Sequence, residues 1–296
     1  MDRPVLSVCV CTYDGAERIA DTIWSLVRQS APDESYEILI VENGSEESDS
    51  LREQIEAFQK GSVSIRLVGE KNLGLSHARN TALRESRGDY LLFIDDDALA
   101  GPRLIERYLS AITRHQPDVI GGNVHPIFAH WPAAEIDYRY WARFSLKLFG
   151  AEDRWLDDDE YFIGTNMGAS RSLLEREGFD PELGRQGGRL AGCEDWFLGE
   201  ERFRRRFVTG ADVFHKVPEE RLDIDYLAKR NRDLRDQLSE LREKGRPVTV
   251  PQRIRSDCES PNPIVAELRL LARKLRYHFV LSRAQRRTRI LRESRT

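Results

Sequence analysis

No run in this 296-residue sequence approaches the roughly 20 consecutive apolar residues that a transmembrane helix needs. The N-terminal residues Met1-Asp2-Arg3-Pro4 also lack the apolar core of a signal peptide. Cysteine is scarce: there are four, and no two of them form a CxxC pair, so we expect ordinary reduced thiols. These absences favour a cytoplasmic protein.

The familiar phosphate-binding loops are absent as well. The sequence has no G-x-G-x-x-G motif after its first strand-like run and no G-x-x-x-x-G-K-[ST] motif anywhere. A dinucleotide-binding domain and a P-loop NTPase are therefore disfavoured. The 40% of apolar and 32% of charged residues are instead typical of a folded globular protein.

Charge is distributed unevenly along the chain, whose net charge is −4. Residues 264–296 hold ten Lys or Arg against two Glu, a net charge of +8. The preceding residues hold 36 Lys or Arg and 48 Asp or Glu, a net charge of −12. We therefore interpret the two parts separately.

Short apolar runs alternate with amphipathic segments in the N-terminal third. The strand-like runs are Val5–Cys11, Tyr36–Val41, Val63–Val68 and Tyr90–Ile94, and the helix-like segments are Ala16–Arg28, Ser48–Lys60 and Leu75–Arg87. This rhythm predicts an α/β fold with a mostly parallel, Rossmann-like sheet flanked by helices. Ligands of such sheets bind at the carboxyl ends of the strands.

Polar residues stand at three of these strand ends. They are Thr12-Tyr13-Asp14-Gly15, Glu42-Asn43-Gly44-Ser45 and Asp95-Asp96-Asp97. Three consecutive carboxylates repel one another unless a cation is bound, and oxygen ligands favour Mg²⁺ or Mn²⁺. An acidic, solvated loop or a helix N-cap ahead of Pro102 is the alternative interpretation of the triplet.

Eight motifs, in this order, resemble those of the family 2 glycosyltransferases of the GT-A fold. They are Ser7–Tyr13, Val41–Ser45, Asn72–Asn80, Phe93–Asp97, Gly164–Arg171, Gly178–Gly184, Cys193–Trp196 and Val213–His215. The resemblance covers about residues 5–230. It implies an inverting enzyme that uses a nucleotide-diphospho-sugar donor.

The resemblance also implies which residues bind the donor. Glu42, where the family usually has Asp, would bind the base, Arg79 would lie near the nucleotide, and Asp95 near the ribose and the metal. The nucleotide-sugar site is completed by Thr12, Tyr13, Asn72, Asp96 as a spacer in the triplet, and Glu194. Asp97 would ligate Mn²⁺ or Mg²⁺, and His215 would complete the metal or diphosphate shell. A surface position for Arg79 and a structural role for His215 are the alternatives.

Asp195 is the predicted catalytic base. The pair Glu194-Asp195 precedes a helix-like segment, and the resemblance implies that Asp195 takes the proton of the acceptor hydroxyl. A carboxylate stabilised by the helix dipole would give the same sequence. Gly187, Gly188 and Gly192 favour a loop that orders over the donor.

We expect a catalytic domain at residues 1–218, with a nucleotide-binding half to about 124 and an acceptor half at 125–218. The aromatic-rich residues 125–163 suit an irregular substrate-covering segment or a second hydrophobic cluster. The sequence of residues 219–244 predicts one helix that ends at Gly245. Its heptad-like face consists of Ile224, Leu227, Asn231, Leu234, Leu238 and Leu241, and favours either a homodimer or packing on the catalytic domain.

A proline-punctuated linker at 245–263 leads to a predicted basic amphipathic helix at 264–296. Such a helix can bind an anionic membrane surface, here through residues 264–292. Docking on the enzyme body and pairing with the acidic remainder of the chain are alternatives. No nucleic-acid-binding module is recognised, and we expect no nucleic-acid partner.

We therefore expect a metal-dependent transferase of the hexosyltransferase class, which moves a sugar from a UDP-sugar to a hydroxyl acceptor. A lipid-linked acceptor fits the basic tail, as does synthesis of a polysaccharide, glycolipid or glycoconjugate at the inner face of the membrane. A non-catalytic scaffold with a transferase fold, binding membrane or protein partners, is the alternative. An Asp-x-Asp phosphatase and a sugar-phosphate nucleotidylyltransferase are disfavoured, because their motifs would follow the first strand.

Overall fold

The computed structural model of the protein describes residues 3–44, 49–59, 61–128, 142, 144–158, 160–222 and 224–246. The basic segment 264–296 and the linker from residue 247 onward lie outside the described residues. So do Cys258 and the aromatic residues between 129 and 141.

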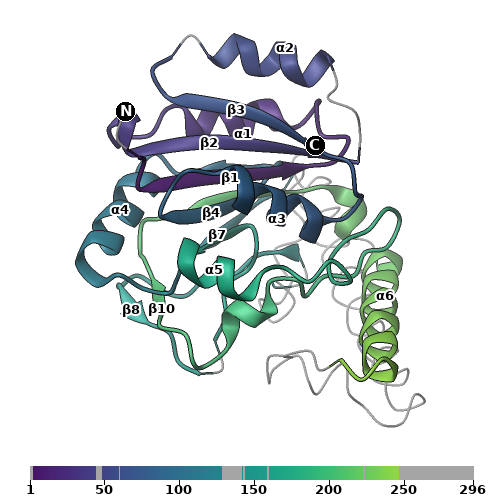
Figure 1. The fold of residues 1–296 in the computed structure, drawn as a ribbon. Coiled ribbons are helices and arrows are strands. Elements are labelled where there is room, and N and C mark those ends of the chain that lie inside the picture. Colours follow the sequence, from purple (N-terminus) through teal and green to yellow (C-terminus); the bar gives the residue numbers. More distant parts are fainter. Residues whose placement is uncertain are drawn as a thin grey trace, which may run out of the picture.

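The larger of two sheets has eight strands in the order β3-β2-β1-β4-β9-β6-β10-β8. The strands are β1 (Leu6–Thr12), β2 (Tyr36–Asn43), β3 (Ser64–Glu70), β4 (Tyr90–Asp95), β6 (Val119–Gly121), β8 (Arg154–Trp155), β9 (Asn166–Ser170) and β10 (Arg205–Phe207). β1 pairs in parallel with β2 and β4, and β2 in parallel with β3, whereas β9 runs antiparallel between β4 and β6. The predicted α/β fold is confirmed, and each predicted strand lies within two residues of an observed one (Figure 1).

Helices cover both faces of this sheet, because its central strands are apolar on both sides. On β1, Leu6, Val8 and Val10 join one buried cluster and Cys9 joins the other, since side chains of a strand alternate. Helices α1 (Ile19–Leu26), α2 (Asp49–Phe58) and α4 (Leu104–His115) pack on the first face. Helices α3 (Leu75–Glu85) and α5 (Arg171–Glu177) pack on the second.

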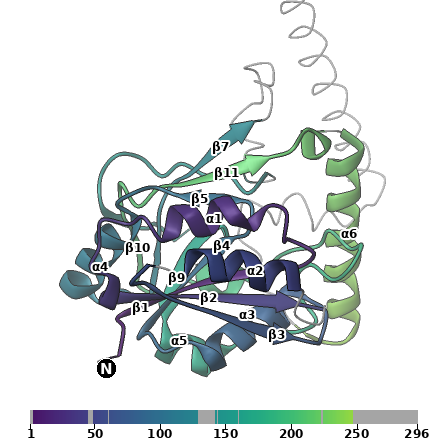
Figure 2. The ribbon, with the colours of Figure 1, turned by 90° about the horizontal axis from the view of Figure 1, so that it is seen from above.

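The smaller sheet brings His215 to the acidic triplet. β5 (Ala98–Ala100) begins directly after Asp97 and pairs with β11 (Val213–Val217), which also pairs with β7 (Val124–Phe128) (Figure 2). In this register His215 stands opposite Ala98, and the amide of Lys216 donates to the carbonyl of Asp97 at 3.0 Å. His215 thus lies in the middle of β11.

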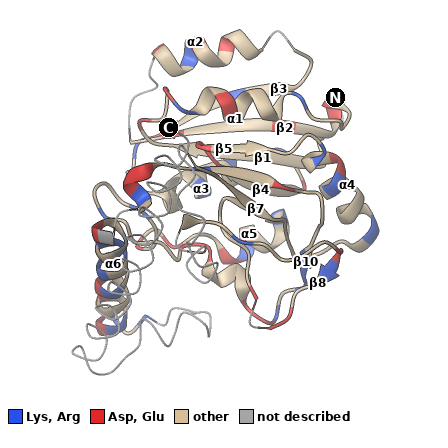
Figure 3. Cartoon of the chain, turned by 180° about the vertical axis from the view of Figure 1, so that it is seen from behind, with Lys and Arg blue, Asp and Glu red and all other residues tan. Residues whose placement is uncertain are grey.

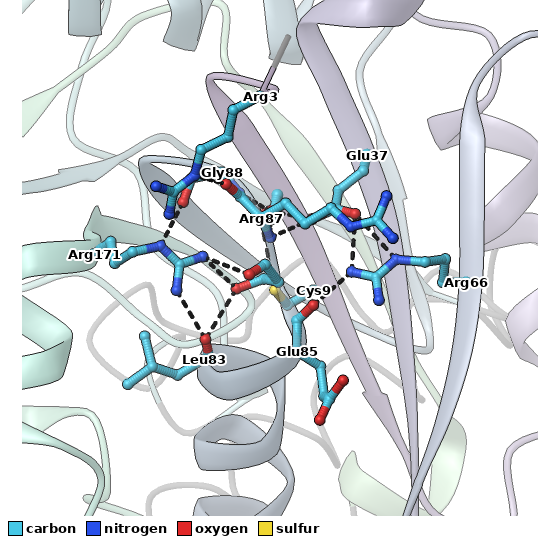
Figure 4. Close-up of polar contacts among 11 residues, drawn as sticks. Arg3, Cys9, Glu37, Arg66, Leu83, Glu85, Arg87, Gly88 and Arg171 are labelled. Atoms are coloured by element: carbon cyan, nitrogen blue, oxygen red, sulfur yellow. Dashed lines mark hydrogen bonds and ion pairs between the residues drawn. The ribbon is translucent and has the colours of Figure 1, made fainter. Parts of the chain in front are cut away.

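A polar network at the amino ends of the strands fixes the helix that carries Arg79 (Figure 4). Buried Glu37 pairs with Arg66 at 3.0 Å. The guanidinium of Arg171 donates to the carbonyls of Leu83, Ser86 and Gly88 at 2.8 to 2.9 Å. The carbonyls at the end of a helix lack intrahelical partners, so Arg171 caps the carboxyl end of α3.

A short 3₁₀ helix (Glu219–Leu222) and then α6 (Ile224–Glu243) occupy the segment predicted as one helix. Leu234, Leu238 and Leu241 of α6 pack against Leu183, Cys193 and Trp196. The heptad-like face is therefore packed on residues 183–196 of its own chain, which is the alternative to the predicted homodimer contact. The side chains of Ile224 and Leu227 lie outside the described part.

Residues 125–163 differ from the predicted irregular segment, because β7 extends to Phe128. Among the described residues of this region, Phe144 and Leu146 join Val124 and Val217 in a small buried cluster. The predicted second hydrophobic cluster is thus present, and Leu146 also lines the cavity described below. Among the described residues, every helix is too short or too polar to span a bilayer.

Candidate active site

A cavity of about 1260 Å³ opens where β1 and β4 end. Its wall is formed by these strand ends, α3, residues 145–148 and 161–165, the loop before Trp196, and α6. Eight of the eleven predicted site residues line it: Thr12, Tyr13, Arg79, Asp95, Asp96, Asp97, Glu194 and Asp195. The predicted groups therefore converge at the carboxyl edge of the sheet.

Three predicted residues do not line this cavity. Glu42 is buried at the second-last position of β2, and its neighbour Asn43 faces the cavity instead, because consecutive strand residues point to opposite sides. Asn72 follows β3, and its carbonyl accepts from the side chain of Asn43 at 2.6 Å. His215 is fully buried, in contact with Asp97.

Within the triplet, Asp95 and Asp96 have different surroundings. Oδ2 of Asp95 accepts from the hydroxyl of Thr165 at 2.5 Å. Asp96 turns back toward β1, where it accepts from the hydroxyl of Thr12 at 2.5 Å and pairs with Arg18 at 3.0 Å. Asp96 thus ties the triplet to the β1–α1 turn, in keeping with a spacer between its neighbours.

Asp97 and His215 have the geometry of two ligands of one cation. Nε2 of His215 lies 3.2 Å from Oδ1 of Asp97 and 3.1 Å from a guanidinium nitrogen of Arg221. A guanidinium only donates, so Nε2 needs a lone pair to accept from Arg221 and a proton to donate to Asp97. One nitrogen cannot do both. A cation held between Nε2 and the Asp97 carboxylate would take the lone pair of Nε2, and Arg221 would then pair with Asp97 alone, whose Oδ2 lies 3.0 Å away.

The remaining donor atoms fit the same site. One ligand atom from each of Asp95, Asp97 and His215 lies within 4.8 Å of the others. Burial alone would raise the pKa of Asp97, but His215 and Arg221 outweigh it and lower this pKa to about 2. Two carboxylates and an imidazole suit a divalent cation such as Mn²⁺ or Mg²⁺.

A buried ion pair stands beside Asp195. Nη1 of Arg79 lies 2.9 Å from Oε1 of Glu194, and only 3% and 6% of the two side chains are exposed. The guanidinium also lies 5.4 Å from the ring centroids of Phe93 and Phe179. A buried charge without its partner is costly, so each group of the pair requires the other. The alternative of a surface position for Arg79 does not hold.

Asp195 itself precedes a short 3₁₀ helix (Trp196–Gly199) and makes no side-chain cap hydrogen bond to it. The helix-like segment predicted after the pair is thus a 3₁₀ helix of four residues. Burial and the adjacent Glu194 carboxylate raise the pKa of Asp195 to about 7, against the opposing effect of Arg79. A carboxyl group that titrates near neutral pH can take a proton from a hydroxyl group and release it again.

Gly164 lets these groups meet. A Cβ at this position would lie 2.4 Å from Nη2 of Arg79 and 2.8 Å from Oδ2 of Asp195. The backbone of Gly164 also hydrogen-bonds the Asp195 carboxylate. The glycine of the Gly164–Arg171 motif is thus required by the close approach of Arg79 and Asp195.

One oxygen of Glu194 is open to a bound molecule. Its Oε2 is buried and has no hydrogen-bond partner among the residues that the structure describes. Unpaired buried carboxylate oxygens are rare in native proteins because they lose hydration without replacement. Glu194 lines the cavity, so a hydroxyl group of a ligand could supply the missing donor.

An apolar platform lies at another part of the cavity. Tyr13 and Leu73 are 51% and 40% exposed, unusual for large apolar side chains, and both line the cavity. A Cβ at Gly44 would lie 2.6 Å from Leu73 and 3.5 Å from the ring of Tyr13, so both side chains lie close to Gly44. An exposed ring of this kind suits stacking with a planar base.

Further residues of the site are not predicted from the sequence. Asn43, Leu73 and Thr165 lie inside the recognised motifs, so the motifs offer a signal for them. Arg18 and Arg221 carry no such signal, because only the folded chain brings them to Asp96 and Asp97.

Comparison with known proteins extends this description. The family model described as "Glycosyl transferase family 2" matches residues 7–178. The glucosyl-dolichyl phosphate glucuronosyltransferase of Haloferax volcanii is 28% identical over 245 residues, which cover 76% of this chain and 74% of that protein. Three further curated relatives match this chain over only 29% to 47% of their own length.

Two solved structures share the fold. The mannosyltransferase PcManGT from Pyrobaculum calidifontis, in complex with GDP-Man and Mn²⁺, has a TM-score of 0.59 at 19% identity, over 96% of this chain and 74% of that one. S. aureus TarS 1-349, in complex with UDP-GlcNAc, has a TM-score of 0.60 at 16% identity, over 93% and 72%. These likenesses confirm the predicted GT-A type of fold. Since the family model matches more than half of the chain, this protein belongs to glycosyl transferase family 2.

Proposed function

We propose that this chain is an inverting glycosyltransferase that moves a sugar from a nucleoside-diphosphate donor, a UDP-sugar, to a hydroxyl acceptor. The observation that carries the proposal is the content of a single cavity. It is lined both by Asp95 and Asp97, which with His215 suit a divalent cation, and by Asp195, whose pKa is raised to about 7.

Asp195 acts as the general base. Its carboxylate takes the proton of the acceptor hydroxyl while the hydroxyl oxygen forms a bond to the anomeric carbon of the sugar. The bond between that carbon and the diphosphate breaks at the same time, and the nucleoside diphosphate leaves. The attack comes from the side opposite the leaving group, so the configuration at the anomeric carbon inverts.

Other residues bind and orient the donor. The ring of Tyr13 stacks with the base and Leu73 contacts it, with Thr12 and Asn43 in the same cavity wall. Glu42 and Asn72 adjoin these residues but do not line the cavity. Oε2 of Glu194 accepts from a sugar hydroxyl. Arg79 holds Glu194 in place through the buried ion pair. Asp95, Asp97 and His215 would hold Mn²⁺ or Mg²⁺, which supplies Lewis-acid stabilisation of the charge that develops on the diphosphate.

The proposal for the acceptor side rests on a relative and on the basic tail. The named Haloferax relative acts on a glucosyl-dolichyl phosphate, a lipid-linked acceptor. The basic residues of 264–292, which lie outside the described part, would suit peripheral contact with an anionic membrane that holds such an acceptor. We therefore place the enzyme in the synthesis of a polysaccharide, glycolipid or other glycoconjugate.

Thermal unfolding in the presence of nucleotides tests the donor site. Since a ligand of the native state raises the Tm, UDP with Mn²⁺ should raise it more than either alone, and Asp97→Asn should abolish the metal-dependent part. Asp158→Asn, at a side chain that is 80% exposed, is the matched control and should respond as the wild type does. If no nucleoside diphosphate gives a metal-dependent shift, the proposal is wrong.

The alternative of a non-catalytic scaffold is separated by a second measurement. Water can replace the acceptor hydroxyl as the nucleophile when no acceptor is present, so release of UDP from UDP-sugars reports catalysis without knowledge of the acceptor. A protein that binds UDP and Mn²⁺ but releases no UDP from any UDP-sugar would support the scaffold. Release that depends on Asp195 supports the transferase.

A further inference from the structure

The loop that leads to Glu194 and Asp195 has little regular structure of its own. Between Leu183 and Glu194 the described chain contains no helix or named strand, and Gly184, Gly187 and Cys193 have φ values of 93°, 56° and 79°. Such a glycine-rich backbone has many accessible conformations, so contacts with other elements must select one. On one side the loop contacts α3, where the amide of Leu75 donates to the carbonyl of Arg185 at 3.1 Å.

On the other side the loop runs along α6, which stands at the end of the molecule where β1 and β2 end (Figures 1 and 2). Nζ of Lys229 donates to the carbonyl of Gly188 at 2.6 Å. Oδ2 of Asp233 accepts from the backbone amide of Leu190 at 2.8 Å and from Lys229 at 2.8 Å. Two successive turns of α6 therefore hold backbone groups of the loop. Figure 3 shows that basic and acidic residues are distributed along this helix.

Gln237 holds both ends of the loop. Its Nε2 donates to the carbonyl of Glu182 at 2.9 Å, and its Oε1 accepts from the thiol of Cys193 at 3.6 Å. The side chain is only 2% exposed and lies on the same helix as Leu234, Leu238 and Leu241, which pack on Leu183 and Trp196. A buried amide is stabilising only when both of its groups are hydrogen-bonded. Both groups of Gln237 are used on the residues that border the loop.

Cys193 is the last residue before the Glu194-Asp195 pair. Its φ of 79° is unusual for a residue with a side chain, and such conformations persist only where the surroundings enforce them. Here the thiol is bonded to Gln237 and the ring of Trp196, one residue past Asp195, lies against α6. The two carboxylates are thus bracketed by contacts with α6.

From these contacts we infer that Gln237 and Asp233 of α6 are positioning residues that hold Asp195 at its place in the cavity. This inference rests on the proposed function, in which Asp195 is the base. Neither the loop nor α6 lies within residues 7–178, the part that the family model matches. α6 is therefore part of the active site, and Asn231 and Leu234 on the same helix also line the cavity.

Two variants of the full chain test the inference against a matched control. Gln237→Leu keeps the size of a buried side chain among leucines but removes both bonds to the loop. Asp233→Ala removes the acceptor of Leu190, and Asp233→Asn restores a neutral acceptor there. Asp236→Ala makes the Asp-to-Ala change at an exposed position of the same helix.

We expect Gln237→Leu and Asp233→Ala to lower the rate of UDP release by about 10- to 100-fold, since displacement of a catalytic group by 1 Å can cost about 10²-fold. Binding of UDP with Mn²⁺ should change little, because that part of the site lies on β1 and β4. Asp233→Asn should recover most of the rate, and Asp236→Ala should match the wild type. The pH midpoint of the rate should fall in the impaired variants, because a displaced Asp195 is less buried.

Hydrogen exchange gives a readout that does not depend on activity. The amide of Leu190 should exchange faster in Asp233→Ala than in Asp236→Ala, with exchange in β1 and β4 unchanged. If Gln237→Leu and Asp233→Ala both retain the wild-type rate and pH midpoint, α6 has no positioning role. The same conclusion follows if the exchange of the Leu190 amide is unaltered in Asp233→Ala. If instead the wild type releases no UDP from any UDP-sugar, the proposed function itself is wrong.

Discussion

The guanidinium of Arg79 lies 2.9 Å from the carboxylate of Glu194, and this buried pair is adjacent to Asp195 in the chain and in space. Asp195 is therefore influenced by two opposite charges. Burial and the Glu194 carboxylate raise its pKa, and Arg79 lowers it. The balance of these effects determines the pH at which the proposed base is ionised.

The first prediction concerns this pH dependence. A base acts only when deprotonated, so the rate of transfer should rise with pH through about 7, the pKa of Asp195. Glu194→Gln removes the negative neighbour and leaves Arg79 unpaired, so the midpoint should move to lower pH. The measurement is kcat/KM for UDP release as a function of pH. Glu175→Gln, on an exposed part of α5, is the control, and an unchanged midpoint in Glu194→Gln would contradict the account.

The second prediction separates proton transfer from binding. Asp195→Asn keeps the shape of the side chain but cannot accept the proton, and general-base catalysis contributes about 10²–10⁴-fold. We expect a loss of this size in kcat, with binding of UDP and Mn²⁺ retained in calorimetry. Transfer at the wild-type rate would show that another group is the base.

The third prediction uses the tight packing at Gly164. In Gly164→Ala the new Cβ would lie 2.4 Å from Arg79 and 2.8 Å from Asp195, so the two side chains must move apart. Overpacking of this kind costs about 1–3 kcal/mol, and the displaced base should reduce turnover strongly. Gly61→Ala is the control, because the nearest atom to a Cβ there would be the carbonyl oxygen of Phe58 at 3.8 Å. Equal turnover in the two variants would argue against a close approach of Asp195 to residue 164.

The fourth prediction tests the capping of α3 by Arg171. Arg171→Met removes the donors to the carbonyls at the end of this helix, and each buried unsatisfied group costs about 1–3 kcal/mol. The free energy of unfolding in urea should fall by at least that amount. The control is Arg176→Met, which also lies on α5 and whose side chain is 61% exposed. It should change the free energy of unfolding by less than about 0.5 kcal/mol. Similar losses in both variants would rule out the cap.

The sequence predicts those parts of the site that depend on local patterns. The runs that form β1, β2 and β4 are apolar on both faces, which is the pattern of a buried parallel strand, so the polar residues at their ends can be placed at one edge. This pattern is sufficient to locate Asp95, Asp96 and Asp97. It does not identify their individual partners, because Thr165, Arg18 and Arg221 reach them only through the folded chain.

Long-range pairing explains the other differences. His215 meets Asp97 because β11 pairs with β5 in one particular register, and a register between distant strands is fixed by packing of the whole molecule. The heptad-like face of α6 has the same pattern whether it packs on a second chain or on its own loop. The structure shows which of the two occurs: Leu234, Leu238 and Leu241 pack on Leu183, Cys193 and Trp196 of the same chain.

The last prediction concerns the basic C-terminal segment, which lies outside the described residues. Ile264, Leu268, Leu271, Leu275 and Phe279 recur at steps of three and four, and residues 264–296 have a net charge of +8. Near an anionic surface each Lys or Arg contributes about 1 kcal/mol, so the full chain should sediment with vesicles that contain phosphatidylserine, and less so in high salt.

A variant with Arg283, Arg286, Arg287 and Arg289 replaced by Glu should stay in the supernatant. Because the proposed catalytic residues are all remote from these positions in the sequence, its UDP release in solution should match the wild type. Equal sedimentation of the two proteins would show that the segment does not bind membranes through its charge, and would favour its docking on the acidic remainder of the chain.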